Sequence, residues 1–186
     1  MAVVVEKYNH EWSKWYYDLY SIIWPNVSSH AKSMEHVGST SVNGLAAKPI
    51  IDIDIIAKDQ KQINLCINSL EKLGYRHRGN LGVEGREAFY NPEKIKYAHH
   101  LYVCLKGSES LLNHLTLRDH LKKNPEDVRE YSKLKIDLAQ KYSDDIEAYV
   151  EGKTNFILNI LSKYNFDNDS LNQIHSTNQK SMHPKR

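Results

Sequence analysis

Two aspartates separated by one residue stand inside a run of isoleucines. Asp52 and Asp54 belong to the segment IIDIDII, residues 50–56, whose β-branched composition favours a strand. Side chains two residues apart on a strand point to the same face, so both carboxylates should emerge together. Such a pair needs compensation, which Mg²⁺ (or Mn²⁺) provides when substrate phosphates and waters complete its oxygen ligands. Two ordinary carboxylates at a solvated strand end are the alternative.

A turn of small residues precedes that strand and has the composition of a phosphate-binding loop. The sequence GSTS, residues 38–41, follows a short run that is typical of a strand. Tight turns expose backbone N–H groups and hydroxyls to phosphate oxygens. We therefore predict that Gly38, Ser39 and Thr40 contact a nucleotide, with Lys48 adding a point charge. A polar loop with a capping serine is the alternative.

The elements that must position these groups follow from hydrophobic periodicity and turn residues. Helices are expected over residues 8–24 (ended by Pro25), 60–73 (ended by Gly74), 108–123, 125–141 and 144–164, with a short helical turn over 44–47. Strands are expected over residues 34–37, 50–56, 75–78, 87–90 and 99–104. The order predicts an α/β (α+β) fold, a mixed β-sheet flanked by helices with a C-terminal helical half. Residues 1–165 should form one domain, and the polar stretch 166–186 a disordered tail.

Length and charge narrow the class of protein. The chain has 186 residues, enough for one core, and its 25 Lys and Arg against 23 Asp and Glu give a net charge of +2, which does not favour a nucleic-acid partner. Cys66 and Cys104 lie far apart without metal-type spacing, so buried reduced thiols are expected. We found no signal-peptide pattern and no membrane-length apolar run, so no membrane partner is expected and a cytoplasmic protein is predicted.

The spacing between the Gly-Ser turn and the two aspartates resembles the nucleotidyltransferase superfamily, which includes polymerase-beta-like enzymes. A longer stretch, EHVGSTSVNGLAAKPIIDI over residues 35–53, resembles the GrpB family, a nucleotidyltransferase-like group. The segments LRDHLK (117–122), EYSKLK (130–135) and YVEGK (149–153) resemble the same family. The resemblance implies that the Gly-Ser turn binds the triphosphate of an NTP and that the aspartates hold Mg²⁺. Asn43 and Tyr102 depart from the family, which commonly has proline and histidine there.

Polymerase-beta-like enzymes usually carry a third carboxylate on a neighbouring strand, and this chain has none in residues 99–104. His100 is the candidate for a ligand or general base in that place, and a structural histidine is the alternative. Glu87 is the other acid that would complete the site. The cations Arg118, Lys135 and Lys153 lie on three expected helices, where they would grip a phosphate or substrate carboxylate or remain ordinary solvated charges.

These observations predict a Mg²⁺-dependent nucleotidyltransferase-like protein that transfers a nucleotidyl group from an NTP to an unidentified acceptor. Catalysis would rest on Asp52, Asp54 and His100, and the substrate contacts on Glu87, Arg118 and Lys153. A non-catalytic module that binds a nucleotide or another phosphorylated ligand on the same fold is the alternative.

Overall fold

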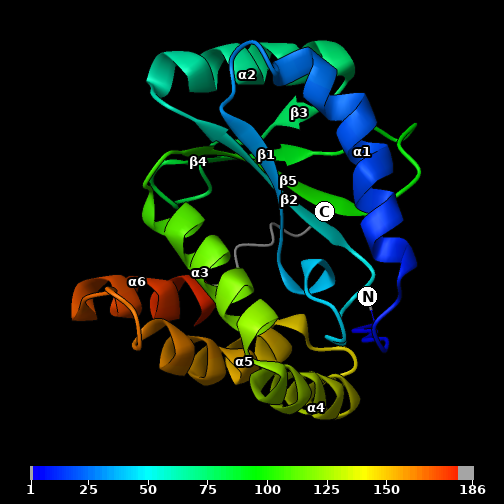
Figure 1. The fold of residues 1–186 in the computed structure, drawn as a ribbon, viewed down its shortest axis with the longest axis vertical. Coiled ribbons are helices and arrows are strands. Elements are labelled where there is room, and N and C mark those ends of the chain that lie inside the picture. The colour runs from blue at the N-terminus through cyan, green and yellow to red at the C-terminus, as the bar shows by residue number, and fades with distance from the viewer. Residues whose placement is uncertain (1, 180–186) are drawn as a thin grey trace.

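A mixed five-stranded β-sheet forms the centre of the molecule (Figure 1), seen in a computed structural model that describes residues 2–179. Its strands are β1 (Ser33–Val37), β2 (Ile51–Ala57), β3 (Arg76–His77), β4 (Arg86–Tyr90) and β5 (His99–Leu105). They lie in the order β1-β2-β5-β4-β3. Strands β2 and β5 pair in parallel, and the other neighbours pair antiparallel. The two parallel strands are therefore central, which is the usual place for buried, isoleucine-rich strands.

Helices cover both faces of this sheet and also form the C-terminal half. They are α1 (Glu11–Val27), α2 (Gln60–Leu73), α3 (Glu109–Lys123), α4 (Pro125–Lys141), α5 (Ile146–Leu161) and α6 (Asn168–Gln179). Helices α1 and α2 pack against one face, and α3 crosses the other, where α4, α5 and α6 continue the helical half (Figure 1). The expected mixed sheet with flanking helices and a helical C-terminal half is confirmed.

The isoleucines of β2 explain why that strand is central. Ile51, Ile53 and Ile55 are fully buried in the core that α1 and α2 form with the sheet. The alternation of a strand then sends Asp52 and Asp54 to the opposite face, toward α3. The predicted division of this strand into an apolar face and an acidic face is confirmed.

Three of the differences from the sequence expectations have a physical explanation. Helix α1 continues through Pro25 to Val27, because a proline in the last turn removes only one backbone hydrogen bond. The expected helical turn over 44–47 is absent, and Ala47 instead forms an isolated β-bridge with Glu6. Residues 168–179 of the expected disordered tail form α6, since Ile174 finds a buried position. Residues 180–186 lie outside the described range.

Other features agree with the sequence. Both cysteines are buried and unpaired. Within residues 2–179, no helix combines the length and the apolar character needed to cross a membrane.

The end of α2 provides a test of local stability. Gly74 caps this helix with φ +100, in the left-handed region that non-glycine residues enter at a cost of about 1–2 kcal/mol. We expect Gly74→Ala to lower the free energy of unfolding in urea by roughly that amount. Asn68→Ala, at an exposed position of the same helix, should be neutral or slightly stabilising. Equal effects of the two substitutions would contradict the capping role.

Candidate functional site

The parallel register of β2 and β5 determines what surrounds the aspartates. Asp52 lies opposite His100, and Asp54 lies opposite Tyr102. His100 Nδ1 is 2.8 Å from Asp52 Oδ1, and His114 Nδ1, from α3, is 2.8 Å from Asp54 Oδ2. Each carboxylate is therefore paired with an imidazole, one from the neighbouring strand and one from the helix above it.

The Asp52–His100 pair is partly accessible to solvent, and we call the accessible surface around Asp52 and the Gly38-Ser39 turn the cleft. Their side chains are 30% and 40% exposed. Burial acts to raise the pKa of Asp52, but the hydrogen bond and charge of His100, with the charges of His114 and Lys48, outweigh it and lower the pKa. Asp52 is thus an anion at neutral pH that orients His100. Among the described residues nothing bonds to Nε2 of His100, which leaves this nitrogen able to accept a proton.

The Asp54–His114 pair is buried. Asp54 is inaccessible to solvent, and its Oδ1 has no hydrogen-bond partner among the described residues. Burial acts to lower the pKa of His114, but the charge and hydrogen bond of Asp54 outweigh it and raise the pKa. A protonated imidazole here compensates a carboxylate that would otherwise be costly to bury.

The turn after β1 brings its backbone against Asp52. Gly38 has φ +66 and ψ −172, a conformation that essentially only glycine adopts. A Cβ at this position would lie 2.1 Å from Asp52 Oδ2, so a side chain cannot fit. Ser41 Oγ donates to the Gly38 carbonyl at 2.6 Å and fixes the turn. The atoms nearest to the position of a Gly38 Cβ are therefore those of the Asp52 carboxylate, and the contact of Gly38 with a nucleotide stays a prediction.

Three lysines from separate parts of the chain converge on this turn and on Asp52, and we call Lys48, Lys135 and Lys153 the lysine cluster. Lys135 is 2% exposed and donates from Nζ to Ser39 Oγ at 2.9 Å. Lys153 and Lys48 place their Nζ atoms 4.6 and 6.0 Å from the centre of the Tyr149 ring. No carboxylate of the described residues lies within 4.0 Å of any of these three amines. The cluster therefore carries a local excess of positive charge.

The pKa values of the cluster reflect that excess. Burial lowers the pKa of Lys153 to about 8, with a further lowering by Lys48 and a partial opposing effect of Asp52. Burial and the charge of Lys153 hold the pKa of Lys135 well below its usual value. The pKa of Lys48 is lowered by burial as well, against the effect of Asp52. An anion entering the cleft would relieve this repulsion.

Thr40, which was predicted to contact the nucleotide, and its neighbour His36 lie behind the turn. His36 pairs with Ile53 in the register, so it points to the α1 face, where it stacks on Tyr16 at 4.6 Å. Burial lowers the pKa of His36 to about 4, and the neutral ring contacts Thr40 Oγ1 at 3.0 Å. Thr40 is 1% exposed and holds the turn from behind. The structure does not place its hydroxyl in the cleft.

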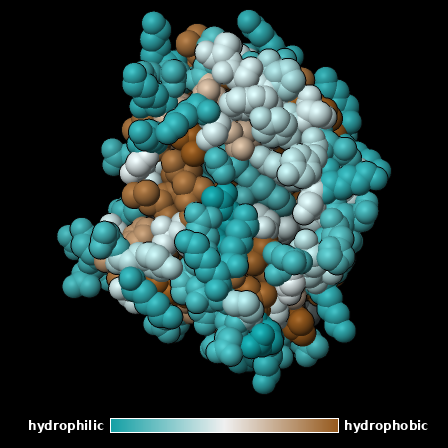
Figure 2. Space-filling model, in the orientation of Figure 1, coloured by the Kyte–Doolittle hydropathy of each residue, from teal (hydrophilic) through white to brown (hydrophobic). Residues whose placement is uncertain are grey.

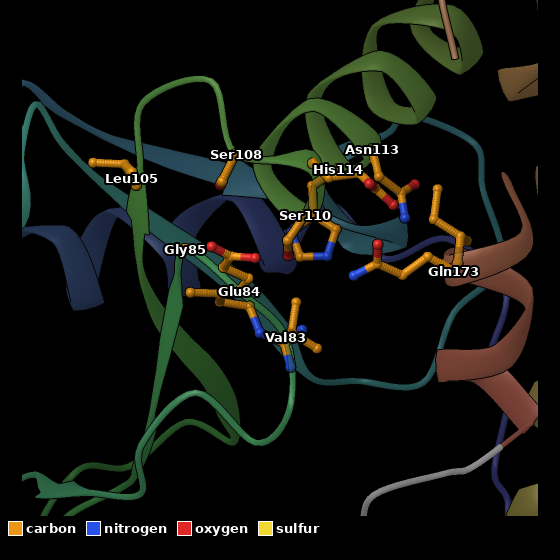
Figure 3. Close-up of a pocket in the computed structure, with 12 residues that line it drawn as sticks. Val83, Glu84, Gly85, Leu105, Ser108, Ser110, Asn113, His114 and Gln173 are labelled. Atoms are coloured by element: carbon orange, nitrogen blue, oxygen red, sulfur yellow. The ribbon is translucent and has the colours of Figure 1, made fainter. Parts of the chain in front are cut away.

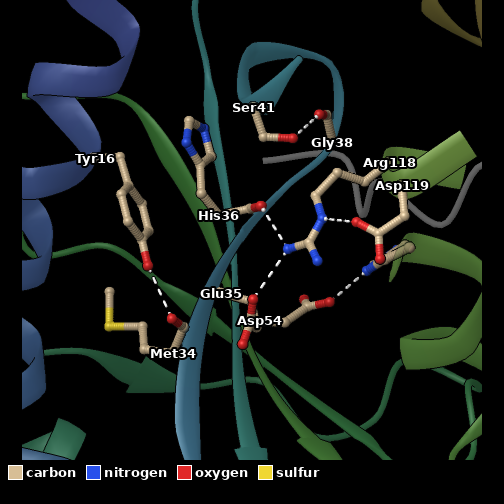
Figure 4. Close-up of polar contacts among 10 residues, drawn as sticks. Tyr16, Met34, Glu35, His36, Gly38, Ser41, Asp54, Arg118 and Asp119 are labelled. Atoms are coloured by element: carbon tan, nitrogen blue, oxygen red, sulfur yellow. Dashed lines mark hydrogen bonds and ion pairs between the residues drawn. The ribbon is translucent and has the colours of Figure 1, made fainter. Parts of the chain in front are cut away.

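The two other predicted substrate contacts are engaged by protein groups. Glu87 pairs with Val103 in the register, on the face opposite the aspartates, and its Oε2 lies 2.7 Å from His77 Nε2. Arg118 lies on the cleft side but bonds to Glu35, Asp119 and the His36 carbonyl (Figure 4), which ties α3 to β1. The structure thus brings together Asp52, Asp54, His100, Gly38, Ser39, Lys48 and Lys153, and it leaves Glu87 apart.

Sequence reasoning missed His114. This residue is one of several polar residues on an amphipathic helix, and only the packing of α3 across β2 brings it to Asp54. Its helical spacing carries no signal for this contact.

The side chains of the site offer few ligands for a metal ion. Within the described range, no group of three or more His, Cys, Asp or Glu side chains is arranged to hold a metal ion. The carboxylates of Asp52 and Asp54 share one face, and two carboxylates are a common protein contribution when phosphates and waters supply the other ligands of Mg²⁺.

The His114 pair predicts a pH-dependent contribution to stability. Because the folded-state pKa of His114 is raised, its contribution is fully present below the unfolded pKa of about 6.5 and is lost as pH rises through the folded value. The difference in free energy of unfolding between the wild type and His114→Gln should therefore be largest below about pH 6.5 and shrink at higher pH. Urea titrations across pH measure this difference, and a constant or growing one would contradict the assignment.

Comparison with known proteins places this geometry in one family. The family model described as GrpB protein matches residues 2–163. A crystal structure titled as the conserved protein GrpB from Enterococcus faecalis superposes with a TM-score of 0.76 and 30% identity, covering 91% of this chain and 98% of that one.

Curated relatives give the same result. The glutamate-rich protein GrpB of Alkalihalophilus pseudofirmus is 29% identical over 165 residues, which are 87% of this chain and 95% of the relative. The UPF0157 protein YqkA of Bacillus subtilis is 34% identical over 125 residues, 67% of this chain but only 36% of the length of YqkA. With a family match that spans almost the whole described fold, the chain belongs to the GrpB protein family.

Proposed function

We propose that this protein binds a nucleoside triphosphate in the cleft and transfers a nucleotidyl group from it to a second molecule. The lysine cluster carries the proposal, because no carboxylate of the described residues lies within 4.0 Å of its three amines. One of them, Lys135, also contacts Ser39 of the turn. Burying positive charge without a counter-ion is costly unless a ligand supplies the anion. A triphosphate fits both the sign and the amount of charge.

The phosphates are expected to contact Ser39, Lys135 and Lys153, with Lys48 neutralising charge from the other side of Asp52. Charge neutralisation and alignment of the triphosphate supply most of the catalysis in such reactions. Nε2 of His100 takes the proton from the attacking group as that group bonds to the α-phosphorus and pyrophosphate leaves. Asp52 holds the ring in position through Nδ1. In this proposal His100 takes the place of the third carboxylate that polymerase-beta-like enzymes usually carry and that residues 99–104 lack.

Magnesium, with manganese as a substitute, is the cofactor of this proposal. The unpartnered Oδ1 of buried Asp54 and the neighbouring carboxylate of Asp52 are the oxygens that would hold it. Bound there, the ion would neutralise phosphate charge.

Binding without transfer is the second candidate function. It is favoured by the histidine partners, since each carboxylate already accepts a hydrogen bond from an imidazole. In that case the cleft would recognise a nucleotide or another phosphorylated ligand through the lysine cluster alone. Calorimetry separates the two functions, because nucleotide binding that is indifferent to Mg²⁺ and to Asp54→Asn supports a binding module.

Lys153→Met should make the protein more stable and should also weaken its binding of ATP. The depressed pKa of Lys153, about 8, means that its charge opposes folding at pH 7, and that stability rises as pH increases through 8. We expect the substitution to raise the free energy of unfolding at pH 7 by on the order of 1 kcal/mol and to weaken ATP binding at least about tenfold.

The matched control is Lys133→Met, which removes an exposed lysine of α4. Thermal unfolding and calorimetric titration of both variants provide the comparison. Loss of stability in Lys153→Met together with unchanged ATP affinity would refute the role of the cluster.

Transfer itself is tested with labelled NTPs, Mg²⁺ or Mn²⁺ and a cell extract as the source of acceptor. His100→Gln should reduce the rate of label transfer by roughly 10²–10⁴-fold, and Asp52→Asn should do likewise because the ring loses its orienting partner. His10→Gln, at an exposed position before α1, is the control and should retain the rate. Label transfer that survives both substitutions in the site would exclude this mechanism.

A further inference from the structure

A second pocket lies beyond the buried Asp54–His114 pair. It has a volume of about 290 Å³ and lies between the loop before β4, the start of α3 and helix α6. Figure 3 shows His114 and Ser110 of α3 facing this space, with Gln173 of α6 across from them and Glu84 on the loop. On the surface, hydrophobic residues gather between β4 and α3 (Figure 2). Most residues that line the pocket are nevertheless polar or charged, so hydrogen bonds and charge would decide which ligand it takes.

Arg86 supplies positive charge to this pocket. Its guanidinium stacks on the Tyr102 ring at 4.5 Å, and no carboxylate of residues 2–179 lies within 4.0 Å of it. Its Nε is buried and has no hydrogen-bond partner in that range. A planar guanidinium held by stacking and left with unused donors is suited to an oxyanion.

Ser108 offers a second unused group. It precedes α3, yet its side chain makes no capping hydrogen bond, and its buried Oγ has no partner among the described residues. Gly85 approaches it closely, because a Cβ on Gly85 would lie 2.7 Å from the Ser108 Cβ. The glycine therefore lets the loop before β4 pack closely against Ser108. A ligand oxygen would satisfy both Ser108 and Arg86, which line the same pocket.

Acidic residues limit how much negative charge the pocket can take. Glu84 and Glu109 line it together with Arg86 and His114. Two cationic and two acidic groups leave no net positive charge in the pocket to bind a polyanion such as a triphosphate. A small molecule with one carboxylate or one phosphate matches the unused donors better.

We propose that this pocket is a second binding site, for a small molecule that presents a carboxylate or phosphate group to Arg86 and Ser108. His114 links the pocket to the acidic face of β2, since its ring lines the pocket and bonds to Asp54. In the two-substrate reaction proposed above, the pocket is the place of the acceptor, and this part of the inference rests on the proposed function.

The test uses backbone amide chemical shifts, because they report the two sites separately. Wild-type protein is titrated with inorganic phosphate in one series and with malonate in another. We expect the amides of Ser110 and Asn113 to shift, and Arg86→Gln to weaken this response at least about tenfold, or 1.4 kcal/mol. Arg76→Gln is the matched control, since Arg76 is exposed and stacks on Tyr90 away from the pocket.

The outcomes separate this inference from the proposed function. A response to malonate identifies a carboxylate ligand, and a response to phosphate alone identifies a phosphorylated one. Ser108→Ala, which removes only the hydroxyl oxygen, gives a second test and should weaken the shifts severalfold even if Arg86→Gln does not fold. The proposed binding site is overturned if the amides of Ser110 and Asn113 do not shift, or if their shifts are unchanged in Arg86→Gln and Ser108→Ala. If ATP still shifts Gly38 and Ser39 in that case, the proposed function survives.

Discussion

Placing two carboxylates on a central strand, one of them fully buried, constrains everything around them. Asp54 is inaccessible to solvent, and an isolated ion in such a place costs several kcal/mol. The protein meets this cost with histidines from different elements, His100 through the parallel pairing of β2 with β5 and His114 through the packing of α3. The position of α3 across the sheet is thus tied to the chemistry of β2. The ion pair of Arg118 with Glu35 and its hydrogen bond to the His36 carbonyl strengthen the same attachment.

The lysine cluster differs from the two carboxylates, because no oppositely charged group of the described residues lies within 4.0 Å of its amines. Lys135 and Lys153 are partly or fully withdrawn from water and repel each other. A sequence selected for stability alone would replace them with apolar residues, so their presence points to a ligand that restores the balance. The Gly38-Ser39 turn gives that ligand a backbone and a hydroxyl at the same place. The proposal of phosphate binding therefore rests on electrostatics, with the resemblance of the motif as separate support.

The sequence predicted the fold well because the signals were local. The isoleucines of β2 required a buried face, Gly74 ended α2 at the expected residue, and Pro125 began α4. The acidic face of β2 followed from strand alternation alone. In the helical half, the tail prediction was wrong for residues 168–179, because an amphipathic helix with few apolar residues is stable only where Ile174 is covered.

Contacts between distant elements could not be predicted from local sequence patterns. Whether Glu87 or His36 faces the aspartates depends on strand register, which no local pattern determines, and both point to the other face. His114 and Arg86 became visible as functional candidates only through the packing of α3 and β4. Lys135 and Lys153 were recognised as cations on two helices, but their convergence on Ser39 depends on how α4 and α5 pack.

A crystal structure with Mg²⁺ and a non-hydrolysable nucleoside triphosphate tests the central claim most directly. The account predicts phosphate oxygens within hydrogen-bond distance of Ser39, Lys135 and Lys153, with the ion beside Asp52 and Asp54. A triphosphate bound outside this cleft, with the three lysines unchanged and without an anion, would contradict it.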